Sequence, residues 1–118
     1  MDTLQKLNLL RECVVGIHDS TWNFGRWFSG GCGCAAGHFS MTDEGKKLGL
    51  RVSTEGTLYE LEGKVEAEAL VKVFDIDYFE AYNLFLPQGY AGYPNVRVTK
   101  ETFLERLDSL IERYSSVA

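Results

Sequence analysis

Residues 99–114 read TKETFLERLDSLIERY and give the clearest fold signal in the chain. Apolar side chains recur there at intervals of three or four residues, which places them on one face of an α-helix. The members of this apolar stripe are Phe103, Leu107, Leu110, Ile111 and Tyr114. Thr99 precedes the stripe and is a residue type that caps helix N-termini. The segment therefore predicts a helix that begins after Thr99 and buries one face.

Other segments also have helical patterns, and two of them begin with a capping pair. Asp2 is followed three residues later by Gln5, and Asp77 by Glu80, which is the spacing of a reciprocal cap. In the predicted helix of residues 64–74, Val65 is expected to face inward with the later apolar residues. The predicted helices cover residues 3–18, 64–74 and 77–85, and a short helix is predicted from Cys34.

Residues 48–62 predict a β-hairpin with Glu55 and Gly56 as a two-residue turn. This turn places apolar side chains on one face and an arginine opposite a glutamate on the other. The expected cross-strand pairs are Leu50 with Leu61, Arg51 with Glu60 and Val52 with Tyr59. Together these segments predict a mainly α (α+β) fold, in which four or five helices pack with one small hairpin at about residues 48–62.

The composition is that of a globular protein. A chain of 118 residues is long enough for one core, so we expect residues 1–118 to form a single domain. Apolar residues make up 45% of the chain, which argues against intrinsic disorder. The formal net charge of −5 argues against direct nucleic-acid binding through phosphate contacts.

Membrane insertion and secretion are not expected from this sequence. The longest uncharged apolar run, residues 13–17, is too short to cross a membrane, and the acidic residues 1–3 do not resemble a signal peptide. Three cysteines, an odd number, argue against a disulfide framework. The expected location is therefore the cytoplasm.

The densest cluster of reactive side chains is Cys32, Cys34 and His38. Thiolates and imidazole are ligands of Zn²⁺, and Cys13 or His18 would supply a fourth. The spacing differs from that of zinc-finger knuckles, so no cofactor is expected and zinc is the alternative. A thiol nucleophile with His38 as base is the enzymatic alternative. In the simplest interpretation, Cys34 is a small buried residue and His38 is held by hydrogen bonds.

Glycines surround this cluster and predict unusual backbone geometry. Those at positions 30, 31 and 33 predict a loop with positive φ angles, and Gly37 would allow two backbones to approach closely. The pattern Gly31-x-Gly33-x-x-Ala36 also matches the letters of a dinucleotide-binding fingerprint. No strand precedes this pattern and no βαβ unit follows it, so we do not expect a nucleotide there.

Negative charge is concentrated between residues 55 and 80. That window holds eight acidic residues and two lysines, a net charge of −6, whereas the rest of the chain carries +1. Solvated helix faces explain such a distribution, and a docking face for a basic protein is the functional explanation. The candidate partner-binding acids are Glu62, Glu66 and Glu68. Direct DNA reading by residues 64–86 is not expected, because the second helix there carries no Lys or Arg.

Two groups of aromatic residues are further candidates, one in residues 22–28 and one in the late loop. Tyr and Trp are common anchors of protein interfaces, and they also fill small cores. We expect Trp22 and Trp27 to be buried, because their region must cover glycine-rich backbone. We expect the loop with Tyr90 and Tyr93 to contact a partner.

Residues 22–38 resemble a motif of small, uncharacterised bacterial and bacteriophage proteins. The motif has an aromatic residue, Asp or Asn, Met or Phe, two variable residues and Trp, followed after a gap by Cys-Gly-Thr-x-x-Cys-x-x-Gly-His/Trp. The chain resembles it in Trp22-Asn23-Phe24-Gly25-Arg26-Trp27 and in Cys34-x-x-Gly37-His38. Ser29 stands in place of the first cysteine, which favours a packing role for Cys34. The resemblance implies a bacterial or bacteriophage origin and no reaction chemistry.

These observations predict a small non-enzymatic domain that binds another protein, for example as an accessory protein of a phage or mobile element. The alternative is a metal-binding or thiol-dependent site at Cys32, Cys34 and His38. A structural subunit of a homo-oligomer is a third interpretation, and the sequence leaves the oligomeric state open.

Overall fold

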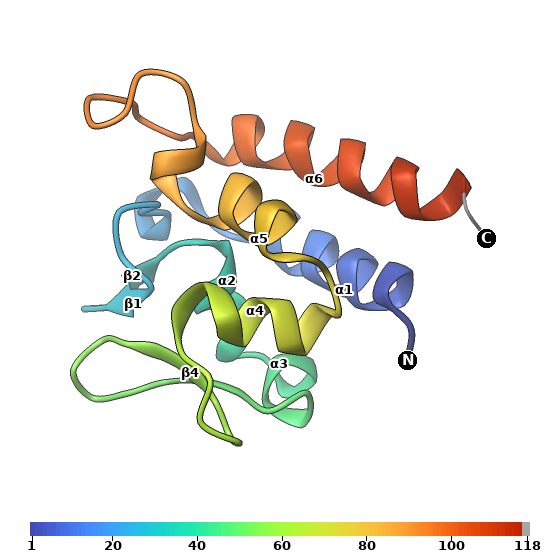
Figure 1. Ribbon diagram of the computed structural model, residues 1–118. Coiled ribbons are helices and arrows are strands. Elements are labelled where there is room, and N and C mark those ends of the chain that lie inside the picture. Colours follow the sequence, from blue (N-terminus) through green and yellow to red (C-terminus); the bar gives the residue numbers. More distant parts are fainter. Residues whose placement is uncertain (117–118) are drawn as a thin grey trace.

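Side-chain caps mark the starts of four of the helices in the computed structural model, which describes residues 1–116 (Figure 1). Both predicted capping boxes form: the Asp2 carboxylate accepts from the Gln5 N–H at 2.8 Å, and the Asp77 carboxylate accepts from the Glu80 N–H at 2.8 Å. The Thr99 hydroxyl accepts from the Thr102 N–H at 3.2 Å. Each cap provides an acceptor for an N–H that the helix itself leaves unpaired.

The predicted fold class is confirmed, since the described chain is mainly helical with two small antiparallel ribbons. The helices are α1 (Thr3–Val15), α2 (Ala35–Ser40), α3 (Asp43–Lys47), α4 (Glu66–Phe74), α5 (Tyr78–Phe85) and α6 (Lys100–Ser116). The strands are β1 (Phe28–Ser29), β2 (Cys32–Gly33), β3 (Leu50–Val52) and β4 (Leu58–Glu60). Single 3₁₀ turns, η1 (Asp19–Thr21) and η2 (Pro87–Gly89), lie in the connections.

Three helix predictions differ from the structure. Helix α1 ends at Val15 instead of residue 18, because Gly16 disfavours helix and its N–H closes the last turn on Cys13. Helix α3, capped by Thr42, was not predicted, because five residues are too few to show a helical period. The inward position expected for Val65 is wrong: α4 begins one residue later, and this side chain is 50% exposed.

The predicted hairpin forms, but its predicted register is wrong by one residue. The observed pairs are Leu50 with Glu60, Arg51 with Tyr59 and Val52 with Leu58. The turn has three residues instead of two, since Ser53 pairs with Thr57 and Gly56 donates its N–H to the Ser53 carbonyl at 2.9 Å. Gly56 has a φ of +85°, which suits the left-handed position that closes a three-residue hairpin loop.

The shifted register exchanges the environments of two adjacent side chains. Glu60 faces the interior and is only 4% exposed, whereas Leu61 is 63% exposed. The Glu60 carboxylate accepts the N–H groups of Glu62 at 3.0 Å and Lys64 at 2.8 Å, and Lys72 Nζ lies 3.6 Å from it. These contacts, of which the Lys64 N–H is the largest cause, lower the pKa of Glu60. The same two N–H hydrogen bonds hold the connection between β4 and α4 in place.

A tight ribbon replaces the open loop expected around residue 30. Gly30 and Gly31 have the predicted positive φ angles and form the turn between β1 and β2. The positive φ expected for Gly33 is wrong, because this residue lies in β2. Its lack of a side chain serves close packing instead, since a Cβ atom there would overlap the Trp27 carbonyl oxygen.

Phenylalanines from four helices form a continuous chain through the hydrophobic core. The ring centroids of Phe39 in α2 and Phe74 in α4 are 5.6 Å apart, and those of Phe74 and Phe85 in α5 are 5.7 Å apart. Phe85 in turn lies 5.9 Å from Phe103 of α6. Around these phenylalanines, α6 packs along α1 and beside α5, as Figure 1 shows. None of the helices within residues 1–116 is both long and apolar enough to cross a membrane.

Candidate functional site

The Cys34 thiol is a core group. Cys34 immediately precedes α2, is 2% exposed and places Sγ 3.9 Å from the Trp27 carbonyl oxygen. Burial raises the pKa of this thiol to about 11, so it stays protonated at neutral pH. Both metal binding and nucleophilic attack need a thiolate. The geometry of Cys34 therefore favours packing over either chemical role.

The other two members of the predicted cluster are engaged with the backbone of residues 20–21. Cys32 is half-buried, with Sγ 3.7 Å from the Ser20 carbonyl oxygen. His38 donates from Nε2 to the Thr21 carbonyl at 2.8 Å, and its ring packs edge-on against Phe28 at 5.1 Å. Among the residues that the structure describes, no three His, Cys, Asp or Glu side chains are arranged to hold a metal ion. These contacts join α2 to the preceding segment.

The three candidate acids gather near the start of α4. Glu66 and Glu68 lie in its first turn and are exposed, and Glu62 lies in the connection that precedes it, where it forms an ion pair with Lys72. Acidic side chains in the first turn interact favourably with the helix dipole. Glu66 and Glu68 form no ion pair with any residue in 1–116, so both charges face solvent.

The two tyrosines of the late loop have different environments. The exposure expected for Tyr90 is wrong: it is 4% exposed, and its hydroxyl donates to the Leu84 carbonyl at 2.8 Å. Arg106 covers its ring at 3.7 Å, and Phe24 packs edge-on at 5.3 Å. Tyr93 is 51% exposed, as expected. Tyr90 is buried because its ring fills the gap between residues far apart in the sequence.

The burial expected for Trp22 and Trp27 is only partial: both side chains are half-buried and pack against the core. Trp22 donates its indole N–H to the Val98 carbonyl at 2.9 Å and lies 5.7 Å from Phe103. Gly33 and Gly37 both pack against the backbone carbonyl of Trp27. The early aromatic stretch therefore joins the core to the loop before α6.

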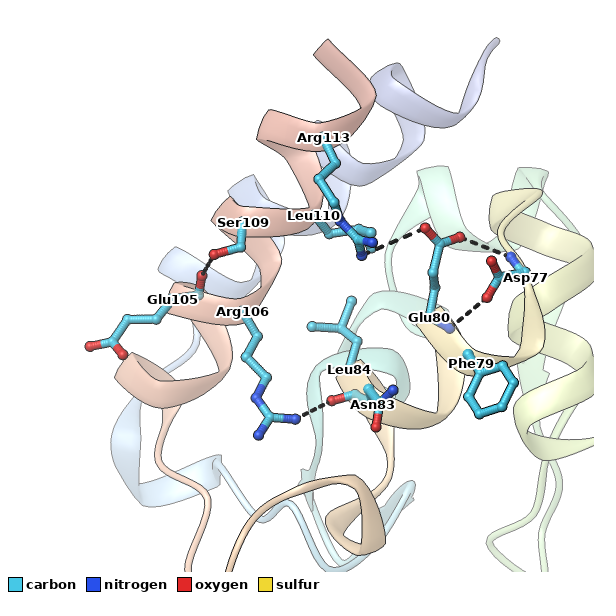
Figure 2. A pocket seen from close by; sticks show the side chains of 10 residues that line it. All are labelled: Asp77, Phe79, Glu80, Asn83, Leu84, Glu105, Arg106, Ser109, Leu110 and Arg113. Atoms are coloured by element: carbon cyan, nitrogen blue, oxygen red, sulfur yellow. Dashed lines mark hydrogen bonds and ion pairs between the residues drawn. The ribbon is translucent and has the colours of Figure 1, made fainter. Parts of the chain in front are cut away.

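A groove lies between α5 and α6 and extends to Asp77, the residue that caps α5 (Figure 2). Its volume is about 570 Å³, and the buried side chains of Leu84 and Leu110 line it. Figure 2 shows two arginines extending from α6 toward α5: Arg113 pairs with Glu80 at 3.6 Å, and Arg106 donates to the Asn83 carbonyl at 2.6 Å. The groove thus has an apolar floor and a charged rim.

Phe79 is the most exposed aromatic side chain of the described chain, at 78%. It also lines the groove and lies at its outer edge, next to the start of α5 (Figure 2). The sequence did not identify Phe79 as a candidate, although the helical period places it outside the buried stripe of α5 and therefore predicts its exposure. That stripe consists of Ala81, Leu84 and Phe85.

No protein-family model matches the chain, and comparison with curated proteins and with solved structures found no match either.

Proposed function

We propose that this chain is a non-enzymatic domain that binds a basic segment of another protein. The binding face consists of an acidic surface and the exposed ring of Phe79. The acidic surface is defined by the exposed carboxylates of Glu62, Glu66, Glu68, Asp75 and Asp77. Three of these acids lie just before α4 or in its first turn, and two lie between α4 and α5, which pack against each other.

The observation that carries the proposal is the exposure of Phe79 next to carboxylates. Burying a side chain of this size contributes about 1.5–3 kcal/mol, which this residue forgoes in the isolated chain. Asp77 and Glu80 flank it in the sequence, and the neighbouring Tyr78 is 53% exposed. An exposed aromatic residue with charged neighbours resembles the anchor and rim of a protein interface.

Charge supports a basic partner. The window from residue 55 to 80 carries −6. Five of its eight acids are exposed and form no ion pair in residues 1–116: Glu55, Glu66, Glu68, Asp75 and Asp77. Opposite charge on a partner would speed its association and orient it on this face. A partner segment with basic residues and one apolar side chain would complement both the carboxylates and the groove beside Phe79.

The chemical alternative at Cys32, Cys34 and His38 has less support. The Cys34 thiol stays protonated, and His38 uses Nε2 in a backbone hydrogen bond. The odd number of cysteines, three, supports the cytoplasm as the compartment of binding. The resemblance of residues 22–38 to bacterial and bacteriophage proteins supports a role as an accessory protein there.

A paired charge reversal tests the proposal. One variant combines Glu62→Lys, Glu66→Lys and Glu68→Lys, and the control combines Glu12→Lys, Glu101→Lys and Glu112→Lys at exposed positions of α1 and α6. Each triple changes the formal charge of the chain from −5 to +1, so the two differ only in where the charge lies.

The melting temperatures of both triple variants are measured first, to show that each is folded. Affinity purification with quantitative mass spectrometry then compares the proteins that the two variants retain. We expect a partner that the wild type and the control retain equally and that the first triple retains at least tenfold less. The proposal is wrong if both triples retain the same proteins, or if no retained protein depends on the three acids.

A further inference from the structure

A second cavity, of about 520 Å³, lies on another part of the molecule. It forms where residues 22–25 meet the loop of residues 93–99 and the first residue of α6. In Figure 1 this is the region where the light-blue segment after α1 and the orange loop before α6 approach each other. None of the acidic-surface residues lines it, so it is separate from the proposed protein-binding face.

Aromatic rings line this cavity from two distant parts of the sequence. Trp22 and Phe24 come from the early aromatic stretch, and their rings stack at 5.9 Å with an interplanar angle of 29°. The indole hydrogen bond to Val98 fixes Trp22, and the contact with Tyr90 fixes Phe24. Tyr93, from the loop, adds a third ring that is half exposed. Two of the three rings are therefore already held in place.

Cations border the same cavity. Lys100 donates from Nζ to the Ile17 carbonyl at 2.7 Å and lies 3.9 Å from the Asp19 carboxylate, so its charge is held at the wall. Arg97 is exposed and has no hydrogen bond or ion pair from its side chain to any residue in 1–116. Two cations and one anion thus line the cavity in a chain whose net charge is −5.

We propose that this cavity binds a small aromatic anion. The ring of the ligand lies against Trp22, Phe24 and Tyr93, and its phosphate or carboxylate group lies at Arg97. The volume is within the range of about 300–1,000 Å³ that is typical of small-molecule sites, and a few polar groups on an otherwise apolar wall give such sites their specificity. The cationic wall disfavours an aromatic cation.

Nuclear magnetic resonance titrations of the ¹⁵N-labelled chain test this proposal. The probes are adenosine monophosphate and indole-3-acetate, with adenosine, indole and inorganic phosphate as partial ligands. We expect saturable shifts of the Trp22 indole N–H and of the backbone amides near residue 97 with at least one aromatic anion. That anion should bind at least tenfold more tightly than its uncharged counterpart and than phosphate, and the two anions distinguish a phosphate ligand from a carboxylate ligand.

Three variants then locate the binding. Arg97→Glu and Tyr93→Ala should each weaken binding of the anion at least tenfold with little change in melting temperature, because both side chains are exposed. Lys47→Glu, the control on α3, makes the same charge change away from the cavity and should bind as the wild type does. The proposal is overturned if no aromatic anion binds saturably, if the uncharged counterpart binds equally well, or if Arg97→Glu has no effect.

Discussion

Gly37 of α2 lies directly against the backbone carbonyl of Trp27, so closely that a Cβ atom at position 37 would overlap its carbon and oxygen. The neighbour is backbone, which cannot rotate away as a flexible side chain can. We therefore predict that Gly37→Ala lowers the free energy of unfolding by about 2–3 kcal/mol, the cost of overpacking a close-packed interior. Urea denaturation followed by circular dichroism measures this change.

Gly16→Ala is the matched control for that prediction. Gly16 has a negative φ of −83°, and a Cβ there would meet the Cys13 carbonyl oxygen at an ordinary 3.5 Å. This substitution should leave stability unchanged or raise it by up to about 1 kcal/mol, because alanine restricts the unfolded chain. Equal effects of the two substitutions would contradict the close approach at Gly37.

The buried carboxylate of Glu60 predicts acid sensitivity. The N–H of Lys64, together with the other partners, lowers the pKa of Glu60 below its ordinary value of 4.5. A carboxyl group with a lowered pKa in the folded state stabilises the fold above the unfolded value, and this contribution is lost as the pH falls below about 4.5. Wild-type stability should therefore fall more steeply between pH 6 and pH 3 than the stability of Glu60→Gln.

Urea titrations at several pH values measure this difference, and Glu12→Gln is the control. Glu12 is exposed near the C-terminal end of α1 and forms no ion pair in residues 1–116, so its substitution should leave the acid dependence close to that of the wild type. Parallel pH profiles for the wild type and Glu60→Gln would show that the carboxylate does not contribute in this way.

Two phenylalanines should differ sharply in their contribution to stability. Phe74 is fully buried in the middle of the core chain of phenylalanines, and Phe79 is 78% exposed. Phe74→Ala should cost about 3–5 kcal/mol, because it leaves a cavity. Phe79→Ala should change stability by less than about 0.5 kcal/mol. If Phe79→Ala also destabilised the isolated chain by several kcal/mol, its ring would be part of the core and not of a binding face.

The thiol of Cys34 should react slowly in the folded chain. Burial raises its pKa from 9.0 to about 11, which alone lowers the thiolate fraction at neutral pH about 100-fold. In a variant with Cys13→Ser and Cys32→Ser, we expect iodoacetamide to alkylate Cys34 at least 100-fold more slowly in buffer than in 8 M urea. Mass spectrometry follows the reaction. Comparable rates in the two solvents would indicate an accessible, activated thiol and revive the thiol-site alternative.

The parts of the fold that local sequence determines could be predicted. The reciprocal caps at Asp2 and Asp77 involve residues only three apart, and the final helix has a long apolar stripe. The hairpin register depended on whether the turn has two or three residues, which a weak turn signal at Gly56 did not specify. The one extra residue in the turn decides which of the Glu60 and Leu61 side chains is buried.

The candidate sites depended on contacts between distant residues, and the sequence indicated them less well. Tyr90 was expected at the surface because its neighbours are loop formers, but Phe24 and Arg106 enclose it. The convergence of Trp22 with Tyr93 around one cavity required the path of the whole chain. The exposure of Glu66 and Glu68 was predictable because neither lies on the apolar stripe of residues 69–74, although the same periodicity wrongly placed Val65 inward.

Site-specific photocrosslinking tests the central claim, that Phe79 and the acidic surface bind a basic partner. A benzoylphenylalanine replaces Phe79 in one variant and Met41, exposed at 51% just beyond α2, in the control. We predict that position 79 crosslinks to a protein through a segment rich in Lys or Arg, that position 41 does not, and that the Glu62, Glu66 and Glu68 reversals abolish the crosslink. Absence of a crosslink specific to position 79, or one that persists when the acids are reversed, would contradict the account.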